Sequence, residues 1–372
     1  LVARCSPIFE NSDLALSFII IIGASTAFFA ATVGLVQNDI KRIIAYSTCS
    51  QLGYMFVALG VGAYQVAIFH LFTHAFFKAL LFLGSGSVIH AMSDEQDIQK
   101  MGGLYKIIPF TWIMMLIGTL ALTGAPLLSG YYSKDAIIES AFVSHAFGHE
   151  YAFYLLVFSA LLTSFYSWRL IFLTFHGKTR ASQDVLSKAH ESPLSMTIPL
   201  LLLSFGALFS GYLFSDFFLS YELKDLWGSS IYTHPDNHIL EEIHHSPFWV
   251  KKIPLVMMVI GFIIAALFYL LLKNVPSFLS NKLSFIYNFL YNKWYFDELY
   301  NFIFVNPLKR IGNFLWLFFD KKIIDGLGPD GISSFVISIS RNVSKIQTGY
   351  VYHYAFAMLI GLGFLLIRFL VY

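Results

Sequence analysis

A row of three ionisable side chains inside an apolar segment is the strongest chemical signal in the sequence. His70, His74 and Lys78 stand four residues apart within the stretch 66–90. On an α-helix each step of four residues turns the side chain by only about 40°, so all three share one face. Imidazole and ammonium groups are costly in an apolar span unless they are solvated or paired, and both can exchange protons. The row therefore predicts a proton relay; the alternative is that these groups only hold helices together.

A second pair of charged residues follows a stretch that cannot form one straight helix. The apolar segment 107–139 is too long for a single span and contains Gly124 and Pro126, so we expect a broken helix there. Broken helices at membrane depth usually line a site or a wet cavity. Lys134 and Asp135 come directly after the expected break. They are interpreted either as a terminal proton carrier beside a gateway or as an interfacial pair at a helix end.

Other polar residues also belong to apolar segments. Lys41 and Arg42 open the segment 42–62 and are candidates for the same relay, or only anchors that set the membrane topology. Arg169 lies deep in the segment 151–175, where we expect it to have a partner, for example a carboxylate of a neighbouring helix. A stripe of polar residues follows the basic pair and could hold water or form hydrogen bonds to neighbouring helices. It consists of Tyr46, Ser47, Thr48, Ser50, Gln51 and Tyr54.

The composition places these residues in a membrane protein. Hydrophobic residues make up 57% of the chain and charged residues only 12%, about half the share that is usual in a soluble domain. The apolar residues form runs long enough to cross a bilayer, for which a helix needs ~20 residues. We therefore predict an all-α membrane protein with about eight transmembrane helices, one of them broken, at 15–37, 42–62, 66–90, 107–139, 151–175, 196–219, 251–273 and 350–371.

The segment 275–349 is apolar and aromatic, but charged residues interrupt it too often for a span. Its apolar residues recur at helical spacing, which predicts a long amphipathic lateral helix along a surface or against partner helices, before the last span. Pro307 and the glycine-rich stretch 326–331 are expected to divide this helix into pieces. The residues that carry the pattern include Phe304, Leu308, Ile311 and Leu315.

The charges of the loops predict an orientation. The loops 63–65 and 145–150 carry no lysine or arginine, and the loop 220–250 is acidic. The positive-inside rule therefore places the N-terminus outside. The basic residues that mark the inner loops are Lys41, Arg42, Lys100, Lys106, Lys178, Arg180 and Lys188.

Several kinds of site are not indicated by the sequence. A net charge of +2 does not suggest a nucleic-acid partner. Cys5 and Cys49 are the only cysteines and form no CxxC motif, so an iron–sulfur or zinc site is not expected. The stretch 326–331 matches GxGxxG, but no βαβ unit surrounds it, and a helix-breaking turn is the better interpretation. Scattered surface histidines, rather than a metal site, are expected for His234, His238, His244 and His245.

These residues resemble a known family. The stretches beginning at Lys41, His70, Met101 and Ser133 are similar to the antiporter-like subunits of respiratory complex I. Phe175–Lys178 and the tail narrow the resemblance to the largest of them, called subunit L in bacteria and NADH dehydrogenase subunit 5 in mitochondria. The resemblance covers essentially the whole chain and is most specific over 40–180. In the tail it rests on 291–300 and 325–326.

The resemblance implies a fold and roles for single residues. The family has two inverted five-helix repeats, followed by extra helices and a lateral helix. This implies the second half of a proton channel at 1–180, two further spans at 181–274, the lateral helix at 275–349 and an anchor helix at 350–372. The family's central relay corresponds here to His70, His74 and Lys78. Its exit-side lysine and the neighbouring acid correspond to Lys134 and Asp135. Its basic pair corresponds to Lys41 and Arg42.

The resemblance also implies a function: proton translocation by a membrane-arm subunit, coupled to NADH:quinone electron transfer in other subunits. No cofactor is expected in this chain; NADH, FMN, iron–sulfur clusters and quinone would belong to partner subunits of the M, N, K, J, A and H types. Membrane lipid is the other expected partner. A bacterial inner membrane is favoured, and a mitochondrial inner membrane also fits. The alternatives are the large subunit of a multisubunit Na⁺/H⁺ antiporter and an inactive structural fragment.

The family's first repeat, with a Glu–Lys pair and a further histidine, would lie upstream of residue 1. The chain is therefore expected to be the C-terminal part of a subunit, as a truncated sequence, a split subunit or a decayed product.

Overall fold

The computed structural model describes residues 1–220, 227–228 and 230–371, and the elements that it names are all helices. Part of the expected acidic loop, 221–226 and 229, lies outside the described residues. The chain consists of two units, Leu1–Trp294 and Tyr295–Tyr372.

Long apolar helices agree with the predicted spans. Seven helices in the described part of the chain are long and apolar enough to cross a membrane, and their ends lie within a few residues of the predicted ones. Together with their composition, this makes the chain a multi-pass membrane protein. They are α2 (Asp13–Val36), α3 (Ile40–Gly60), α4 (Tyr64–Ala91), α7 (His149–Phe175), α9 (Leu194–Leu219), α11 with its π-helical end (Phe248–Leu271) and α17 (Val351–Val371).

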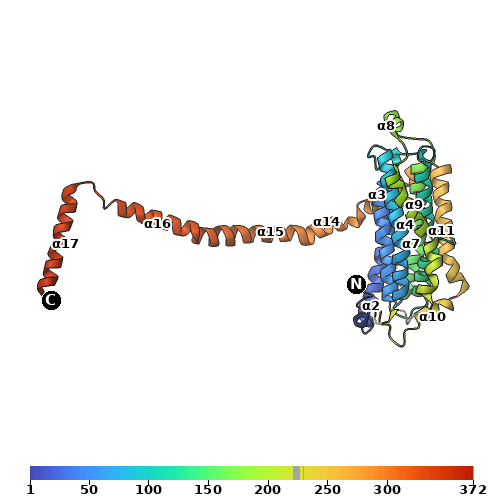
Figure 1. Cartoon of the computed structure of the whole chain (residues 1–372), viewed down its shortest axis with the longest axis horizontal. Coiled ribbons are helices and arrows are strands. Elements are labelled where there is room, and N and C mark those ends of the chain that lie inside the picture. The colour runs from blue at the N-terminus through green and yellow to red at the C-terminus, as the bar shows by residue number, and fades with distance from the viewer. Residues whose placement is uncertain (221–226, 229, 372) are drawn as a thin grey trace. The chain divides into compact units, whose positions relative to one another are not determined.

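The first unit is a bundle in which these helices, other than α17, lie side by side (Figure 1). Helices α2 and α3 approach closely because small residues face each other: a Cβ added to Gly53 would lie 2.5 Å from the backbone nitrogen of Ala27. Shorter helices connect or flank the bundle: α1 (Ser6–Phe9), α8 (Gln183–Lys188), α10 (Ile239–His244), α12 (Val275–Lys282), α13 (Ser284–Tyr291) and single turns at Ile98–Lys100 and Leu104–Lys106.

The predicted broken helix is confirmed. Its halves are α5 (Pro109–Thr123) and α6 (Ser129–Val143). Gly124 ends α5 with φ +84°, a left-handed conformation that glycine adopts without strain. Leu127 also has a positive φ, of 71°. The break therefore leaves the carbonyl end of α5 and the amide end of α6 inside the bundle, where side chains can reach them.

A polar layer separates two apolar clusters along the bundle. On α3 the segments 40–44 and 54–58 contribute to different clusters, and on α4 so do 66–67 and 77–91. Buried polar side chains lie in between on α3, α4 and α6, at the level where α5 and α6 meet. This layer contains Ser47, Ser50, Gln51, His70, Thr73, His74, Ser133, Lys134 and Asp135.

The second unit begins with a continuous helical run over Phe296–Asp325, in which α- and π-helical stretches alternate. The prediction that Pro307 breaks this run was wrong. Pro307 lies in the first turn of α15 (Asn306–Leu315), directly after the π-helical turn Asn301–Val305. The i→i+5 pattern of that turn accommodates the proline ring, which would clash in a regular α-helix.

Other residues divide the tail. The left-handed backbone at Lys293, Trp294 and Tyr295, with φ between 55° and 57°, interrupts the helical chain just after α13. No proline is involved in this break. Gly328 precedes α16 (Pro329–Ser344) with non-helical angles, as the glycine-rich stretch predicted. No residue of α14 (Phe296–Tyr300), α15, α16 or α17 is buried.

Candidate functional site

His70 is the centre of a hydrogen-bonded array that joins three helices. Its Nε2 lies 3.0 Å from Oε1 of Gln51 on α3, and its Nδ1 lies 2.9 Å from Oγ of Ser133 on α6. Because the amide oxygen accepts, this arrangement has the proton on Nε2 and the Ser133 hydroxyl donating to Nδ1. Thr73 extends the array, with its hydroxyl 2.7 Å from that of Ser133.

The hydroxyl of Ser133 has a second acceptor. The backbone oxygen of Ser129 lies 3.3 Å from Ser133 Oγ, one turn earlier on α6. The hydroxyl can therefore donate either to His70 or to this carbonyl. A hydroxyl that can change its acceptor in this way is able to pass a proton on, which a single fixed hydrogen bond is not.

His74 and Lys78 continue the row on α4, as the spacing predicted. The rings of His70 and His74 are 5.8 Å apart, centre to centre. Nε2 of His74 is buried and has no hydrogen-bond partner among the described residues. The ammonium of Lys78 donates to the hydroxyl of Ser47 and, at 3.3 Å, to the carbonyl of Ile44. All three members of the row are buried.

Lys134 and Asp135 lie at the helix break. The ammonium of Lys134 donates to the backbone oxygen of Thr123 at 3.0 Å, which satisfies a carbonyl that the break leaves free at the end of α5. Both carboxylate oxygens of Asp135 are buried and have no hydrogen-bond partner among the described residues. The two side chains form no ion pair with each other in that part of the chain. Buried groups left unpaired in this way are expensive and mark functional sites more often than structural ones.

The basic pair Lys41–Arg42 is placed elsewhere. Both residues are exposed in the first turn of α3. Arg42 faces Asp39, the N-cap of this helix, with 3.8 Å between nitrogen and oxygen. No hydrogen bond among the described residues joins the pair to the buried row. The structure thus brings His70, His74 and Lys78 together on one face and leaves Lys41 and Arg42 at the surface.

Arg169 has partners other than the carboxylate that the sequence suggested. Its guanidinium donates to the backbone oxygen of Gln37 and, at 2.6 Å, to the side-chain oxygen of Asn38, in the loop between α2 and α3. It also lies over the ring of Tyr269, 5.9 Å from the ring centre. These contacts fix the end of α7 to the loop that leads into α3.

Sequence reasoning missed several residues of the site, some of which contact the row. Ser133 and Thr73 are small hydroxyl residues, and nothing in their spacing distinguishes them from ordinary helix contacts. Gln51 was recognised only as part of a polar stripe. Glu139, four residues after Asp135 on α6, accepts a hydrogen bond of 2.9 Å from the hydroxyl of Ser246. A carboxylate at i+4 from Asp135 was a signal in the sequence that could have identified it.

The groups in this arrangement are all capable of proton exchange. Its members are imidazoles, ammonium groups, hydroxyls and a carboxylate, all of which bind and release protons without a cofactor. Among the described residues, no group of three or more histidine, cysteine or acidic side chains is placed to hold a metal ion.

Two family models match the chain. Residues 1–163 match the model described as NADH:quinone oxidoreductase/Mrp antiporter, TM, and residues 238–369 match NADH dehydrogenase subunit 5 C-terminus. The first match covers the row on α4 and the broken helix, and the second covers α11, the tail helices and most of α17.

Curated relatives agree with both matches. NADH-ubiquinone oxidoreductase chain 5 of Phytophthora infestans is 49% identical, over 97% of this chain and 55% of the relative. NADH-quinone oxidoreductase subunit L of Rhodobacter capsulatus is 44% identical, over 97% of this chain and 60% of the relative. NADH-quinone oxidoreductase subunit L of Rickettsia bellii is 48% identical, over 95% of this chain and 54% of the relative.

The chain thus spans between 54% and 60% of the length of these relatives. The chain belongs to the family of NADH dehydrogenase subunit 5 and NADH-quinone oxidoreductase subunit L, and it corresponds to the C-terminal part of those proteins.

Proposed function

We propose that this chain forms part of a proton path across the membrane, through the row on α4 and on to Lys134. The observation that carries the proposal is the array around His70, which is bonded on both ring nitrogens and links α3, α4 and α6 in the polar layer. A proton that arrives at one ring nitrogen can leave from the other, which is how an imidazole shuttles protons.

The proposed path starts at Lys78 and passes His74 and His70. Lys78 and His74 face the same side of α4, and His74 has a buried nitrogen free to bind a proton. A buried nitrogen without a partner is costly unless water reaches it, so the proposal includes water between His74 and its neighbours. Ser133 then connects His70 to α6, the helix that carries Lys134.

The exit is proposed to follow α6. Lys134 and Asp135 lie at the helix break, and Glu139 is one turn further along the same face as Asp135. Glu139 is bonded to Ser246, which lies between α10 and α11 at the predicted outer ends of the helices. These acidic groups lead from the buried lysine toward the surface. Lys41 and Arg42 lie at the opposite end of α3 and are proposed to set the potential at the inner entrance rather than to carry protons.

We propose that the driving force comes from NADH:quinone electron transfer in other subunits. The relatives' names describe oxidoreductases, whereas an iron–sulfur cluster needs about four thiolate ligands and this chain has two cysteines. The iron–sulfur clusters are therefore assigned to partner subunits, and NADH, FMN and quinone are proposed to bind there as well. The tail supports assembly with such partners, because its apolar side chains are exposed: Phe304 by 53%, Leu308 by 65% and Ile311 by 54%.

A Na⁺/H⁺ antiporter subunit is the second candidate. The description of the first family model names both oxidoreductases and antiporters, so the match over 1–163 does not separate them. The match over 238–369 is to a model that names only NADH dehydrogenase, and it favours the oxidoreductase. Co-purification of the chain with a membrane complex that does not oxidise NADH would favour the antiporter.

Replacement of Lys78 by Met tests the proposed function. The variant keeps an unbranched side chain, one atom shorter, and removes the ammonium, so the number of protons moved per NADH oxidised should fall when the full membrane complex is reconstituted in liposomes. Lys188→Met, in an exposed loop helix, is the matched control and should leave this number unchanged. An unchanged proton yield for Lys78→Met would contradict the proposal.

A further inference from the structure

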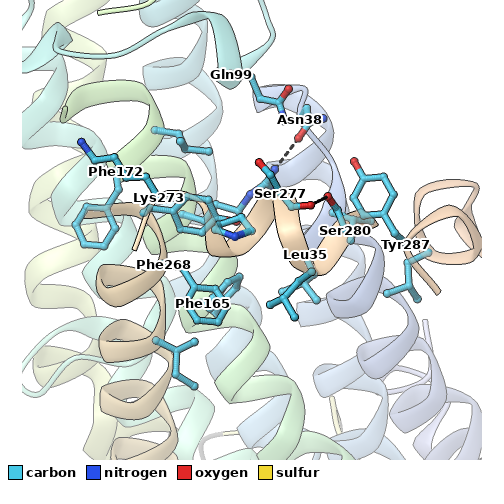
Figure 2. Close-up of a pocket in the computed structure, with 18 of the residues that line it drawn as sticks. Leu35, Asn38, Gln99, Phe165, Phe172, Phe268, Lys273, Ser277, Ser280 and Tyr287 are labelled. Atoms are coloured by element: carbon cyan, nitrogen blue, oxygen red, sulfur yellow. Dashed lines mark hydrogen bonds between the residues drawn. The ribbon is translucent and has the colours of Figure 1, made fainter. Parts of the chain in front are cut away.

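A groove opens on one side of the first unit, beside the end of α7. Its volume is about 780 Å³, within the ~300–1,000 Å³ of typical small-molecule sites. It lies between the end of α2, the second half of α7 and the end of α11, and α12 and α13 cover it from the side (Figure 2). It is separate from the row on α4, no residue of which lines it.

The groove is amphipathic along its length. Figure 2 shows Phe165, Phe268 and Leu35 at one end and Gln99 and Asn38 at the other. The polar end lies where the membrane-spanning helices stop, since α7 ends at Phe175 and the π-helical end of α11 stops at Leu271. Apolar side chains thus line the part inside the membrane, and polar ones line the part at its surface.

The charge of the groove has one sign. Besides His176, four lysine and arginine side chains line it, and none of its lining residues is acidic. Two of the four are held by the protein itself: Arg169 by Gln37 and Asn38, and Arg180 by backbone oxygens that include that of Leu173, at 2.7 Å. The ammonium groups of the other two, Lys178 and Lys273, are exposed and make no hydrogen bond or ion pair among the described residues. Two cations are therefore available to a ligand.

We propose that this groove binds an anionic phospholipid, with its phosphate held by Lys178 and Lys273 and an acyl chain along Phe165 and Phe268. The anionic and apolar parts of the ligand match the basic and apolar parts of the groove. Basic pockets between membrane helices at the inner surface favour anionic head groups. Under the predicted orientation, the polar end of the groove faces the inner leaflet, where anionic lipids are found. A free phosphate would leave the apolar end empty, and an apolar partner helix would leave the two ammonium groups unpaired.

Lipid counting by mass spectrometry tests the proposal. The full protein is purified from its membrane and placed in nanodiscs of phosphatidylcholine to which phosphatidylglycerol is added. Lys178→Gln/Lys273→Gln should weaken the retention of phosphatidylglycerol about thirty-fold, because each basic side chain near an anionic head group contributes a factor of about five and the two factors multiply. Lys106→Gln/Lys188→Gln removes the same charge from the same predicted side, outside the groove, and should retain the lipid.

A second variant tests the apolar end. Leu161→Trp places a larger side chain in the groove and leaves both lysines in place, so it should also reduce lipid retention. Equal retention of phosphatidylglycerol by the double variant and its control would overturn the proposal. Equal retention of phosphatidylcholine by the unmodified protein, or a cross-link from Ser280→Cys to a protein instead of a lipid, would overturn it as well. Lipid retention and cross-linking do not depend on proton transfer, so these experiments test the groove independently of the proposed function.

Discussion

Ser133 offers the sharpest test of a single link in the proposed path. Ser133→Ala removes the hydroxyl that lies 2.9 Å from Nδ1 of His70 and 2.7 Å from the hydroxyl of Thr73, and it leaves Nδ1 buried without this partner. A buried polar atom that loses its partner costs about 1–3 kcal/mol. If this hydroxyl passes the proton from α4 to α6, its loss also removes a hydrogen bond that the transferring proton needs, and a barrier higher by about 1–3 kcal/mol slows transfer by roughly 5- to 150-fold.

The matched control is one turn away on the same helix. Ser129 is equally buried, but its hydroxyl has no hydrogen-bond partner among the described residues. Ser129→Ala deletes the same atom without breaking a hydrogen bond, so it should not lower stability and should leave proton transfer unchanged. The assay compares the rate of proton transfer by the reconstituted complex for the two variants at equal NADH oxidation. Equal rates for Ser133→Ala and Ser129→Ala would refute the role of the His70–Ser133 contact.

Two further changes test packing and charge outside the row. Gly130→Ala should lower the thermal unfolding midpoint, because the new Cβ would lie 1.9 Å from the backbone oxygen of Ala121. Such overpacking costs about 1–3 kcal/mol. The control Gly86→Ala adds a Cβ that would meet nothing within 4 Å, so it should raise the midpoint slightly. Burial raises the pKa of Glu10, so the folded protein binds this proton more tightly than the unfolded chain does. Its contribution to stability should therefore fall as the pH rises above 4.5, the usual value of this group. Glu10→Gln keeps an oxygen acceptor for Asn237 and should remove that fall from a series of melting curves; an unchanged pH dependence would refute the assignment.

The sequence predicts the parts of this fold that depend on local pattern. Long apolar runs locate the spans, the glycines and Pro126 locate the break between α5 and α6, and a spacing of four places His70, His74 and Lys78 on one face. Each of these follows from helix geometry or backbone chemistry within a few residues.

Contacts between distant segments are not contained in such patterns. The partner of Arg169 proved to be a loop carbonyl and an amide more than a hundred residues away, and no periodicity distinguishes Asn38 from other loop residues. The role of Ser133 depends on how α6 turns toward α4. Pro307 was misjudged because the π-helical turn before it has no sequence signature as plain as that of a break.

The most direct test of the path asks whether Lys78 and Lys134 act in series. Protons moved per NADH oxidised are measured in liposomes for Lys78→Met, for Lys134→Met and for the double variant. On a single path either change interrupts the same flow, so the double variant should lose no more than the more severe single one. Losses that add, with the double variant moving fewer protons than either single variant, would mean two independent routes and would contradict the account.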